Sequence, residues 1–480
     1  MQHLNRINHQ GLPAIGGQTL PVIDPATGET YGELARSDAR DVDLAVHGAR
    51  ACFEGPWSQL DATDRGRLLM ALSRSVNDNA AELAALEQRD CGKPVSQAKA
   101  DVVALARYFE FYAGACDKLH GETLPFRNGY TALTWREPHG VTGHVIPWNY
   151  PMQIFGRSVG GALAAGNVCV VKPAEDACLS LLRLTELMAE VGFPAGSIQM
   201  VTGLGHEAGQ ALCEHPGIDH ISFTGSPRVG TLVQQIAAAH HCPVTLELGG
   251  KSPQIVFDDA PVDLALGFLV NAIVQNAGQT CSAGSRLLVQ RNLYEPLLER
   301  LGQAFEGLRA GPPEMDLDLG PLIRASQLAR VQTMLDEARG DGIVTAAQGK
   351  VVPQASANGF YHPPVLLRDV PVDHRIAQEE VFGPVLCAMP FDTEEDALRL
   401  AHATPFGLVA GVWTRDGARQ LRMAKALQCG QVFINNYGAG GGIELPFGGV
   451  GASGHGREKG FEALVGFTRL KTVAIRHEGV

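Results

Sequence analysis

The stretch from Asn276 to Arg286 holds the residue types best suited to covalent chemistry in this sequence of 480 residues. It reads Asn-Ala-Gly-Gln-Thr-Cys-Ser-Ala-Gly-Ser-Arg, so Cys281 lies between two small hydroxyl residues and among neighbours of little bulk. Such a segment can bring a sulfur atom and several backbone N–H groups against a small reactant. Because a thiolate is a strong nucleophile near neutral pH, Cys281 is a candidate nucleophile. The alternative, common for a single cysteine, is a small side chain packed in the core.

Two polar residues far from this stretch have the chemistry to assist a nucleophile. Glu247 precedes Leu-Gly-Gly at the end of a predicted strand. A carboxylate in a partly apolar crevice has a raised pKa and can act as a general base. Asn149, between Trp148 and Tyr150, offers an amide donor without charge, which suits the stabilisation of an oxyanion.

The segments that must position these side chains alternate between strands and helices from residue 141 onward. Short β-rich runs are separated by helical periodicity at 141–146, 168–172, 198–201, 218–223 and 244–248. This alternation predicts a parallel, doubly wound sheet, in which ligands bind beyond the carboxyl ends of the strands. Four such ends carry polar or glycine residues that would line one crevice: 147–149, 172–175, 224–226 and 247–250.

A second alternation begins after Gly250, with strands expected at 255–257, 287–290 and 381–389 and helices at 263–276, 294–308, 394–403 and 416–427. We therefore predict an α/β protein with two doubly wound, Rossmann-like domains, with Cys281 in the second.

The first 140 residues have a different pattern. A turn-rich edge is expected at 1–36 and helices at 41–53, 62–90 and 96–119. Alternating apolar and polar residues then predict a hairpin over 121–138 with exposed aromatic side chains, including Trp135. Such a hairpin is either an oligomer contact or an ordinary surface feature.

Two strand ends have residues suited to a dinucleotide. Gly225-Ser-Pro-Arg-Val-Gly230 follows a strand and opens a helix, where backbone N–H groups and Ser226 suit a pyrophosphate. An ordinary capped helix start is the alternative. Lys172 and Glu175 can hold the hydroxyls of an adenosine ribose, and Glu175 would repel a 2′-phosphate, which favours NAD over NADP. A surface ion pair is the alternative for these two.

Composition excludes several classes of function. The net charge of −12 (39 basic and 51 acidic residues) argues against nucleic acid as a partner. None of the ten cysteines forms a Cys-x-x-Cys pair, so we expect no metal site, and their scatter predicts reduced thiols in a cytoplasmic protein. No apolar run of about 18 residues occurs, so we expect no membrane span.

Seven segments, in this order, resemble the motifs of the NAD(P)-dependent aldehyde dehydrogenase superfamily over nearly the whole chain. They are Pro147-Trp-Asn-Tyr-Pro151, Lys172-Pro-Ala-Glu175, Phe223-Thr-Gly-Ser226, Leu246-Glu-Leu-Gly-Gly-Lys251, Gly278-Gln-Thr-Cys-Ser-Ala283, Glu379-Glu-Val-Phe-Gly-Pro384 and Pro446-Phe-Gly-Gly449. Seven motifs together are far more specific than any one of them.

The resemblance implies a mechanism. Cys281 would attack an aldehyde carbonyl, Asn149 and the Cys281 backbone N–H would hold the oxyanion, and Glu247 would activate the water that hydrolyses the thioester. NAD would be the hydride acceptor, with NADP the less favoured cofactor. The residues that would contact it are Ile146, Trp148, Lys172, Glu175, Gly205, Gly225, Ser226, Val229, Glu380 and Phe382.

Glu247 also favours the hydrolytic, non-acylating branch, because relatives that pass the acyl group to coenzyme A usually lack this base. A coenzyme-A-acylating semialdehyde dehydrogenase and a catalytically silent structural relative are the alternatives. A cysteine hydrolase is a third, but no histidine lies in a matching motif.

Three positions depart from the common pattern of the family. Arg157 stands where many relatives have an aromatic residue, and it would pair either with a substrate carboxylate or with a carboxylate of the protein. A semialdehyde or another polar or aromatic aldehyde is therefore the expected substrate. Ser158 replaces a lysine that, with a glutamate matching Glu458, is thought to help a proton leave the site. The loop 438–442 is glycine-rich, which suggests a roomy tunnel mouth.

We assign residues 1–120 and 139–249 to an NAD-binding domain and 250–452 to a catalytic domain. Residues 121–138 and 453–480 resemble oligomerisation elements of the family, which implies a homodimer or homotetramer.

Overall fold

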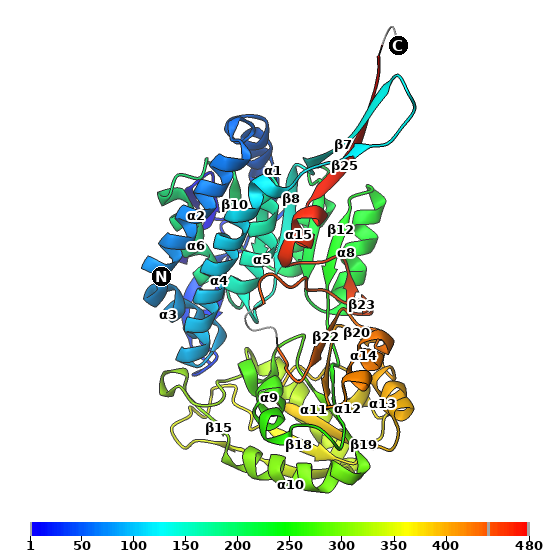
Figure 1. The fold of residues 1–480 in the computed structure, drawn as a ribbon. Coiled ribbons are helices and arrows are strands. Elements are labelled where there is room, and N and C mark those ends of the chain that lie inside the picture. Colours follow the sequence, from blue (N-terminus) through cyan, green and yellow to red (C-terminus); the bar gives the residue numbers. More distant parts are fainter. Residues whose placement is uncertain (1, 439–441, 478–480) are drawn as a thin grey trace.

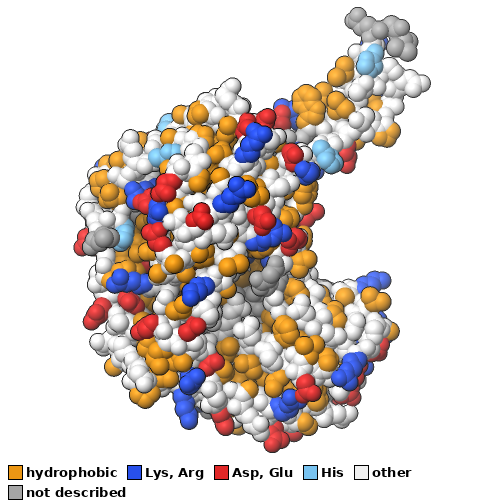
Figure 2. Space-filling view, turned by 60° about the vertical axis from the view of Figure 1, so that its left-hand side comes forward, with side chains coloured by type: hydrophobic (Ala, Val, Ile, Leu, Met, Phe, Trp, Pro, Cys, Tyr) orange, Lys and Arg blue, Asp and Glu red, His pale blue; other side chains and the backbone are white. Residues whose placement is uncertain are grey.

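The computed structural model describes residues 2–438 and 442–477, which form two α/β lobes and a projecting arm (Figure 1). The fold confirms the predicted class of two doubly wound domains. The two lobes face each other across a hollow that opens at one side of the molecule (Figure 2).

The first lobe is built on a sheet whose strand order is β24-β12-β11-β8-β9-β10-β2-β3. Its central strands are parallel and almost entirely buried, as expected for strands covered on both faces. The bounds are β2 Asn5–Ile7, β3 Gln10–Leu12, β8 Val141–Ile146, β9 Val168–Pro173, β10 Ile198–Met200, β11 His220–Thr224, β12 Val244–Glu247 and β24 Gly454–His455. The chain runs from β8 to β9 and β10 on one side and places β11 and β12 on the other, so the topological switch point lies between β8 and β11.

Helices cover both faces of this sheet, and α5 is buried almost throughout. The helix predicted over 62–90 is wrong as a single element, because Asn79 leaves helical geometry and ends α2 with its backbone N–H on Ser75. The bounds are α1 Ala39–Glu54, α2 Ala62–Asp78, α3 Ala80–Cys91, α4 Val95–Ala115, α5 Pro151–Ala164, α6 Leu179–Glu190, α7 Gln210–Glu214 and α8 Pro227–Ala239. A short antiparallel pair, β4 Thr19–Ile23 and β5 Thr30–Ala35, lies outside the sheet, with β1 Gln2–His3 beside β5.

The second lobe has a sheet of strand order β16-β18-β19-β14-β13-β21-β22, parallel except for β16. The strand expected at 381–389 begins only at Val385, because Phe382 adopts a positive φ of 58° and Pro384 has no N–H to donate. The strands are β13 Pro253–Val256, β14 Arg286–Gln290, β16 Val344–Gln348, β18 Val365–Arg368, β19 Val385–Phe391, β21 Val409–Trp413 and β22 Gln431–Ile434. The helices are α9 Val262–Val274, α10 Arg291–Gly307, α11 Ala325–Gly340, α12 Arg375–Gln378, α13 Glu394–Ala401 and α14 Gly417–Ala426.

The predicted hairpin forms most of the arm. Strand β7 (Tyr130–Pro138) pairs briefly with β6 (Thr123–Leu124) and along its whole length with the antiparallel β25 (Thr468–Arg476). Within residues 453–477, β25 pairs with this hairpin, whereas β24 joins the first sheet and α15 (Gly460–Gly466) packs against α5. No helix among the described residues is long and apolar enough to cross a membrane.

Candidate active site

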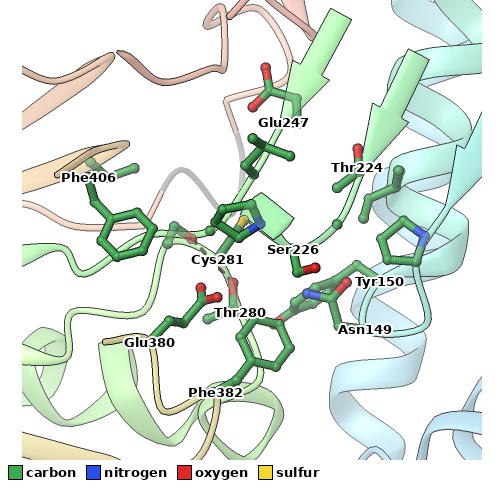
Figure 3. A pocket seen from close by; sticks show the side chains of 18 of the residues that line it. Asn149, Tyr150, Thr224, Ser226, Glu247, Thr280, Cys281, Glu380, Phe382 and Phe406 are labelled. Atoms are coloured by element: carbon green, nitrogen blue, oxygen red, sulfur yellow. Dashed lines mark hydrogen bonds between the residues drawn. The ribbon is translucent and has the colours of Figure 1, made fainter. Parts of the chain in front are cut away.

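A cavity of about 890 Å³ lies between the lobes, at the carboxyl ends of β8, β11 and β12. The three residues predicted to act in catalysis, Asn149, Glu247 and Cys281, all line it. Figure 3 shows them around the sulfur of Cys281, with Glu380 and Phe382 at the same cavity. The structure thus brings together side chains that are far apart in the sequence.

Cys281 follows a turn whose backbone is left-handed at three successive residues, Asn276, Ala277 and Gly278, with φ of 49°, 53° and 74°. Only glycine adopts this region without steric cost, and a Cβ at Gly278 would lie 2.3 Å from the backbone of Gly383. The strained turn is held from outside, since the Asn276 backbone N–H donates to the Gln97 side chain at 2.9 Å. This turn therefore sets the position of the Cys281 sulfur.

The thiol of Cys281 is the protonated form at rest. Burial raises its pKa to about 12, although the cation of Arg157 acts in the opposite direction. A reactant that enters the cavity must therefore meet a base or a positive charge near the sulfur before the thiolate forms.

Asn149 is joined to the turn that carries the nucleophile. Its amide Nδ2 donates to the carbonyl of Gln279 at 3.0 Å, and its backbone carbonyl accepts from Asn276 Nδ2 at 2.9 Å. One of the two amide N–H groups is thereby fixed in direction, which orients the other. This is the arrangement that a donor to an oxyanion needs.

Glu247 ends β12, is 1% exposed, and neither of its carboxylate oxygens has a hydrogen-bond partner among the described residues. Burial, followed by the nearby Glu458 carboxylate, raises the pKa of Glu247 well above its ordinary value. A buried carboxyl group without partners is costly in a folded protein and is typical of a functional site.

Arg157 pairs with a carboxylate of the protein. Its Nε forms a buried ion pair with Glu458, and its guanidinium lies over the ring of Phe447, 4.8 Å from the centroid. Of the two partners that the sequence leaves open, the structure therefore provides the protein carboxylate. Arg157 still lines the cavity, so its positive charge acts on the site.

A buried polar network continues from Glu458 into the first lobe. Ser222 donates to Glu458 at 2.8 Å, Ser158 donates to Ser222 at 3.0 Å, and His144 Nδ1 lies 2.5 Å from the Ser158 hydroxyl. The sequence singled out Ser158 as a departure from its relatives, but it gave no sign of the contact with Ser222 or His144. Both contacts arise from the pairing of β8 with β11 and the packing of α5 on them.

The cofactor side of the cavity begins at the amino end of α8, where Gly225 and Ser226 line the wall. The Ser226 hydroxyl accepts the backbone N–H of Val229 at 3.4 Å, so the alternative of a capped helix start is realised. Pro227 has no N–H and the Gly230 N–H donates to the Ser226 carbonyl at 2.9 Å, so in this first turn the Arg228 N–H is left for an anion at the helix start.

Five of the predicted cofactor residues do not line the cavity. Ile146, Lys172, Glu175 and Gly205 lie at or after strand ends, and Val229 lies in the first turn of α8. Lys172 Nζ pairs with Glu175 at 2.8 Å, and Ile146 ends β8. Gly205 opens a short π-helical turn whose Gly209 approaches Lys172. Burial favours the neutral form of Glu175, but the ion pair with Lys172 outweighs it and lowers the pKa of Glu175, so this carboxylate is charged at neutral pH.

Helix α11 holds the segment that carries Glu380 and Phe382, a contact that the sequence did not predict. Gln327 donates to the carbonyls of Val381 and Phe382 at 3.1 and 2.8 Å, and Arg330 donates to the carbonyl of Glu380 at 2.8 Å. These bonds keep Phe382 in its strained conformation, with its ring 5.3 Å from that of Trp148.

The residues present fit a dinucleotide. A Cβ at Gly249 would meet the Glu380 carboxylate at 2.6 Å, so only glycine lets the chain and this carboxylate approach so closely. The rings of Trp148 and Phe382, which meet edge to face, line the same cavity as Cys281, and so does the start of α8. Such a combination suits a ring and a pyrophosphate.

This fold and this site define an oxidoreductase with a cysteine in a dinucleotide cavity. The chain belongs to the aldehyde dehydrogenase family, whose model matches residues 14–473. The activity is accordingly the NAD-dependent oxidation of an aldehyde.

Known proteins resemble the chain over nearly its whole length. A solved structure of a candidate aldehyde dehydrogenase from Burkholderia cenocepacia is 66% identical, with a TM-score of 0.98, and the match covers 99% of this chain and 100% of that one. The NAD⁺ complex of an aldehyde dehydrogenase from Bacillus cereus is 37% identical with a TM-score of 0.96, over 99% and 97% of the two chains. Hydroxyisobutyraldehyde dehydrogenase of Mycolicibacterium austroafricanum is 41% identical over 98% of this chain and 93% of its own.

The glycine-rich loop predicted at the tunnel mouth lies mostly outside the described residues, which end at Gly438 and resume at Gly442. Gly438 itself lines the cavity.

Proposed function

We propose that Cys281 attacks the aldehyde carbonyl and that the product is the free carboxylic acid. The observation that carries this proposal is the cavity that holds Cys281, Asn149 and Glu247 together. Once the Cys281 thiol has given its proton to solvent, the thiolate adds to the carbonyl carbon, and Asn149 Nδ2 and the Cys281 backbone N–H stabilise the negative oxygen. A bound NAD would supply the hydride acceptor, and loss of the hydride from the tetrahedral intermediate would leave a thioester on the sulfur.

Glu247 acts in the second half of the reaction. Its carboxylate takes a proton from a water molecule, the hydroxide attacks the thioester carbon, and the C–S bond breaks to release the acid and the thiolate. The raised pKa of Glu247 suits a base that must take and return a proton near neutral pH. Glu380 and Phe382 would position the ribose and ring of the cofactor, and Lys172 and Glu175 would hold its adenosine ribose.

Arg157 acts as a positioning residue in this proposal. Its ion pair holds the Glu458 side chain near Glu247, at the cavity end of the network that runs to His144. Position 158 is a serine here, where many relatives have a lysine. Arg157 would therefore provide the positive charge beside Glu458 that the Ser158 hydroxyl does not.

A turnover assay tests the proposed reaction. With a panel of acidic, aromatic and aliphatic aldehydes, NADH should form with at least one aldehyde and without coenzyme A. An absolute need for coenzyme A would favour the acylating alternative, and the absence of NAD reduction with every aldehyde would contradict the proposal.

The cofactor preference gives a separate prediction at Glu175. Because its charge would repel a 2′-phosphate, Glu175→Gln should raise kcat/KM with NADP roughly 10-fold relative to NAD. Steady-state kinetics with both cofactors measure this ratio, and Glu207→Gln is the control because Glu207 is a partly buried carboxylate paired with Arg36. A wild-type enzyme that prefers NADP would contradict the role of Glu175.

We also propose a homodimer or homotetramer that assembles through the arm. The pairing of β7 with β25 places Leu133, Trp135, Val473 and Ile475 on one face, and Trp135 and Ile475 are about half exposed. A projecting ribbon with an apolar face is marginal in water unless another surface covers it.

A cytoplasmic location is proposed on the ten free cysteines, since thiols persist in a reducing compartment.

A further inference from the structure

Lys459 lines the same cavity as Cys281 and is 6% exposed. It immediately follows Glu458, whose carboxylate is already paired with Arg157. The Nζ of Lys459 lies 5.9 Å from the centroid of the Phe447 ring, on which Arg157 also packs. Two cations therefore share one aromatic side chain at the wall of the cavity.

The two cations differ in their partners. Among the described residues no carboxylate oxygen lies within 4.0 Å of Lys459 Nζ, whereas Arg157 has Glu458. The nearby Glu444 forms an ion pair with Arg107 instead. Burial, followed by the nearby Arg157 cation, lowers the pKa of Lys459 to about 8, and Glu444 acts in the opposite direction. The side chain is thus mostly protonated at neutral pH and forms no ion pair with the part of the chain that the structure describes.

The backbone of Lys459 is strained as well. Its φ of 63° and ψ of 166° fall in a region that is essentially confined to glycine and costs on the order of 1–3 kcal/mol for other residues. Hydrogen bonds on both sides hold it there: Glu458 and Phe447 exchange backbone bonds at 2.6 and 2.8 Å, and the Gly460 N–H donates to the Ile443 carbonyl at 2.8 Å. Glycine would be the unstrained residue, yet the position holds a lysine whose side chain faces the cavity.

Both features point to a ligand. Burying an ammonium group without a counter-charge is unfavourable, and a strained conformation persists where the surroundings impose it, often at binding sites. An anion that enters the cavity would supply the missing charge. Arg157 and Glu458 neutralise each other and the raised pKa of Glu247 favours its neutral form, so Lys459 adds a positive charge to this part of the cavity.

We propose that Lys459 binds a carboxylate at the end of the aldehyde remote from its carbonyl group, so that the preferred substrates are carboxylate-bearing aldehydes. This inference rests on the proposed function of the Cys281 site. Arg157 is paired with Glu458, so Lys459 and not Arg157 would recognise the anion of the substrate.

The test compares a carboxylate-bearing aldehyde with its neutral ester. We suggest 4-oxobutanoate, 5-oxopentanoate and 6-oxohexanoate, each against its methyl ester, with NAD and the full chain. The wild-type enzyme should favour the carboxylate at the chain length it oxidises fastest. Lys459→Gln should reduce the ratio of kcat/KM for carboxylate over ester by roughly 10- to 100-fold, mainly through KM, since a hydrogen bond to a charged group is lost.

Two further variants control for charge and folding. Lys459→Arg keeps the charge and should retain most of the preference. Lys459→Gly relieves the backbone strain, so it should melt no lower than wild type while losing the preference like Lys459→Gln. Succinate should inhibit ester oxidation competitively with the aldehyde in wild type, and much more weakly in Lys459→Gln.

The outcomes separate the inference from the reaction on which it rests. Oxidation of both substrate classes by wild type without a preference for the carboxylate would overturn the inference alone. So would an equal loss for carboxylate and ester in Lys459→Gly. No NADH from these carboxylates and esters, in an enzyme that oxidises an aromatic or another aliphatic aldehyde, would also overturn the inference, whereas no NADH from any aldehyde would contradict the proposed function.

Discussion

At the scale of single residues, the chemistry depends on Glu247 and Arg157, which line the cavity, and on the buried Glu458, which pairs with Arg157. Glu458 raises the pKa of Glu247, and Arg157 lowers it, while Arg157 is paired with Glu458. The base proposed to activate water is therefore tuned by an ion pair, and the two members of that pair act on it in opposite directions.

Substitutions of the pair should shift the pH dependence of thioester hydrolysis in opposite directions. The rate rises with pH as Glu247 loses its proton, so Glu458→Gln should move this rise to lower pH and Arg157→Met should move it to higher pH. The pH profile of steady-state turnover, in conditions where hydrolysis limits the rate, measures both shifts. Shifts in the same direction would contradict this electrostatic account.

The same raised pKa has a consequence for stability. Because the folded state holds the Glu247 proton more tightly than the unfolded state, the contribution of this residue to stability is greatest at low pH. That contribution is lost as the pH rises above the ordinary pKa of a carboxyl group and through the raised pKa of the folded state.

Each single variant of the ion pair leaves a buried charge unpaired and should also lower the free energy of unfolding by about 3–5 kcal/mol.

The sequence predicted which residue types would meet at the site but not all of their partners. Cys281, Asn149 and Glu247 could be identified because each has a distinctive chemistry at a predicted strand end or glycine-rich stretch. The partner of Arg157 could not, since Glu458 reaches it only through the packing of the C-terminal segment on the first lobe. Lys459 was missed because its importance lies in a backbone conformation and a lack of partners, and neither leaves a pattern in the sequence.

At the scale of elements, the turn before Cys281 is the critical one. Gly278→Ala would place a Cβ within 2.3 Å of Gly383, in a conformation that already disfavours alanine. The turn should shift and displace the sulfur, which should lower kcat/KM by at least about 100-fold.

Gly267→Ala, on α9 just before this turn, is the matched control. Apart from the local backbone of α9, no atom of the described residues lies within 4 Å of its added Cβ, so it should leave kcat/KM near the wild-type value and stabilise the helix by up to about 1 kcal/mol. Initial rates and thermal melting of both variants give the comparison. Full activity in Gly278→Ala would show that the turn tolerates a side chain and would contradict the role given to it.

The elements themselves were largely predictable, because buried parallel strands and amphipathic helices have clear periodicities. The errors fall where local backbone geometry overrides periodicity. The helix break at Asn79 and the late start of β19 after Phe382 are both of this kind. The contact of α11 with the Glu380–Phe382 segment was not predicted because it joins two elements without a shared motif.

At the scale of the whole molecule, the two lobes form the cavity and the arm extends away from both (Figures 1 and 2). The sequence predicted the hairpin but not that β25 would pair along the whole of β7. Long-range strand pairing of this kind depends on where the two ends of the chain meet.

The arm gives a prediction about assembly. Trp135→Glu combined with Ile475→Glu would place two charges on its apolar face, so the protein should dissociate to a smaller species. Sedimentation velocity measures the mass of the assembly, and Leu421→Glu, at an exposed leucine on α14, is the control. An unchanged mass in the double variant would contradict assembly through this face.

Cys281 is proposed to carry a thioester, which is hydrolysed by water that Glu247 activates. Rapid mixing of the Glu247→Gln variant with NAD and an aldehyde tests this most directly. The account predicts a burst of about one NADH per active site followed by very slow turnover, with an acyl group on Cys281 detected by mass spectrometry of the quenched protein. Continued turnover at the wild-type rate, or an acyl group on any other residue, would contradict it.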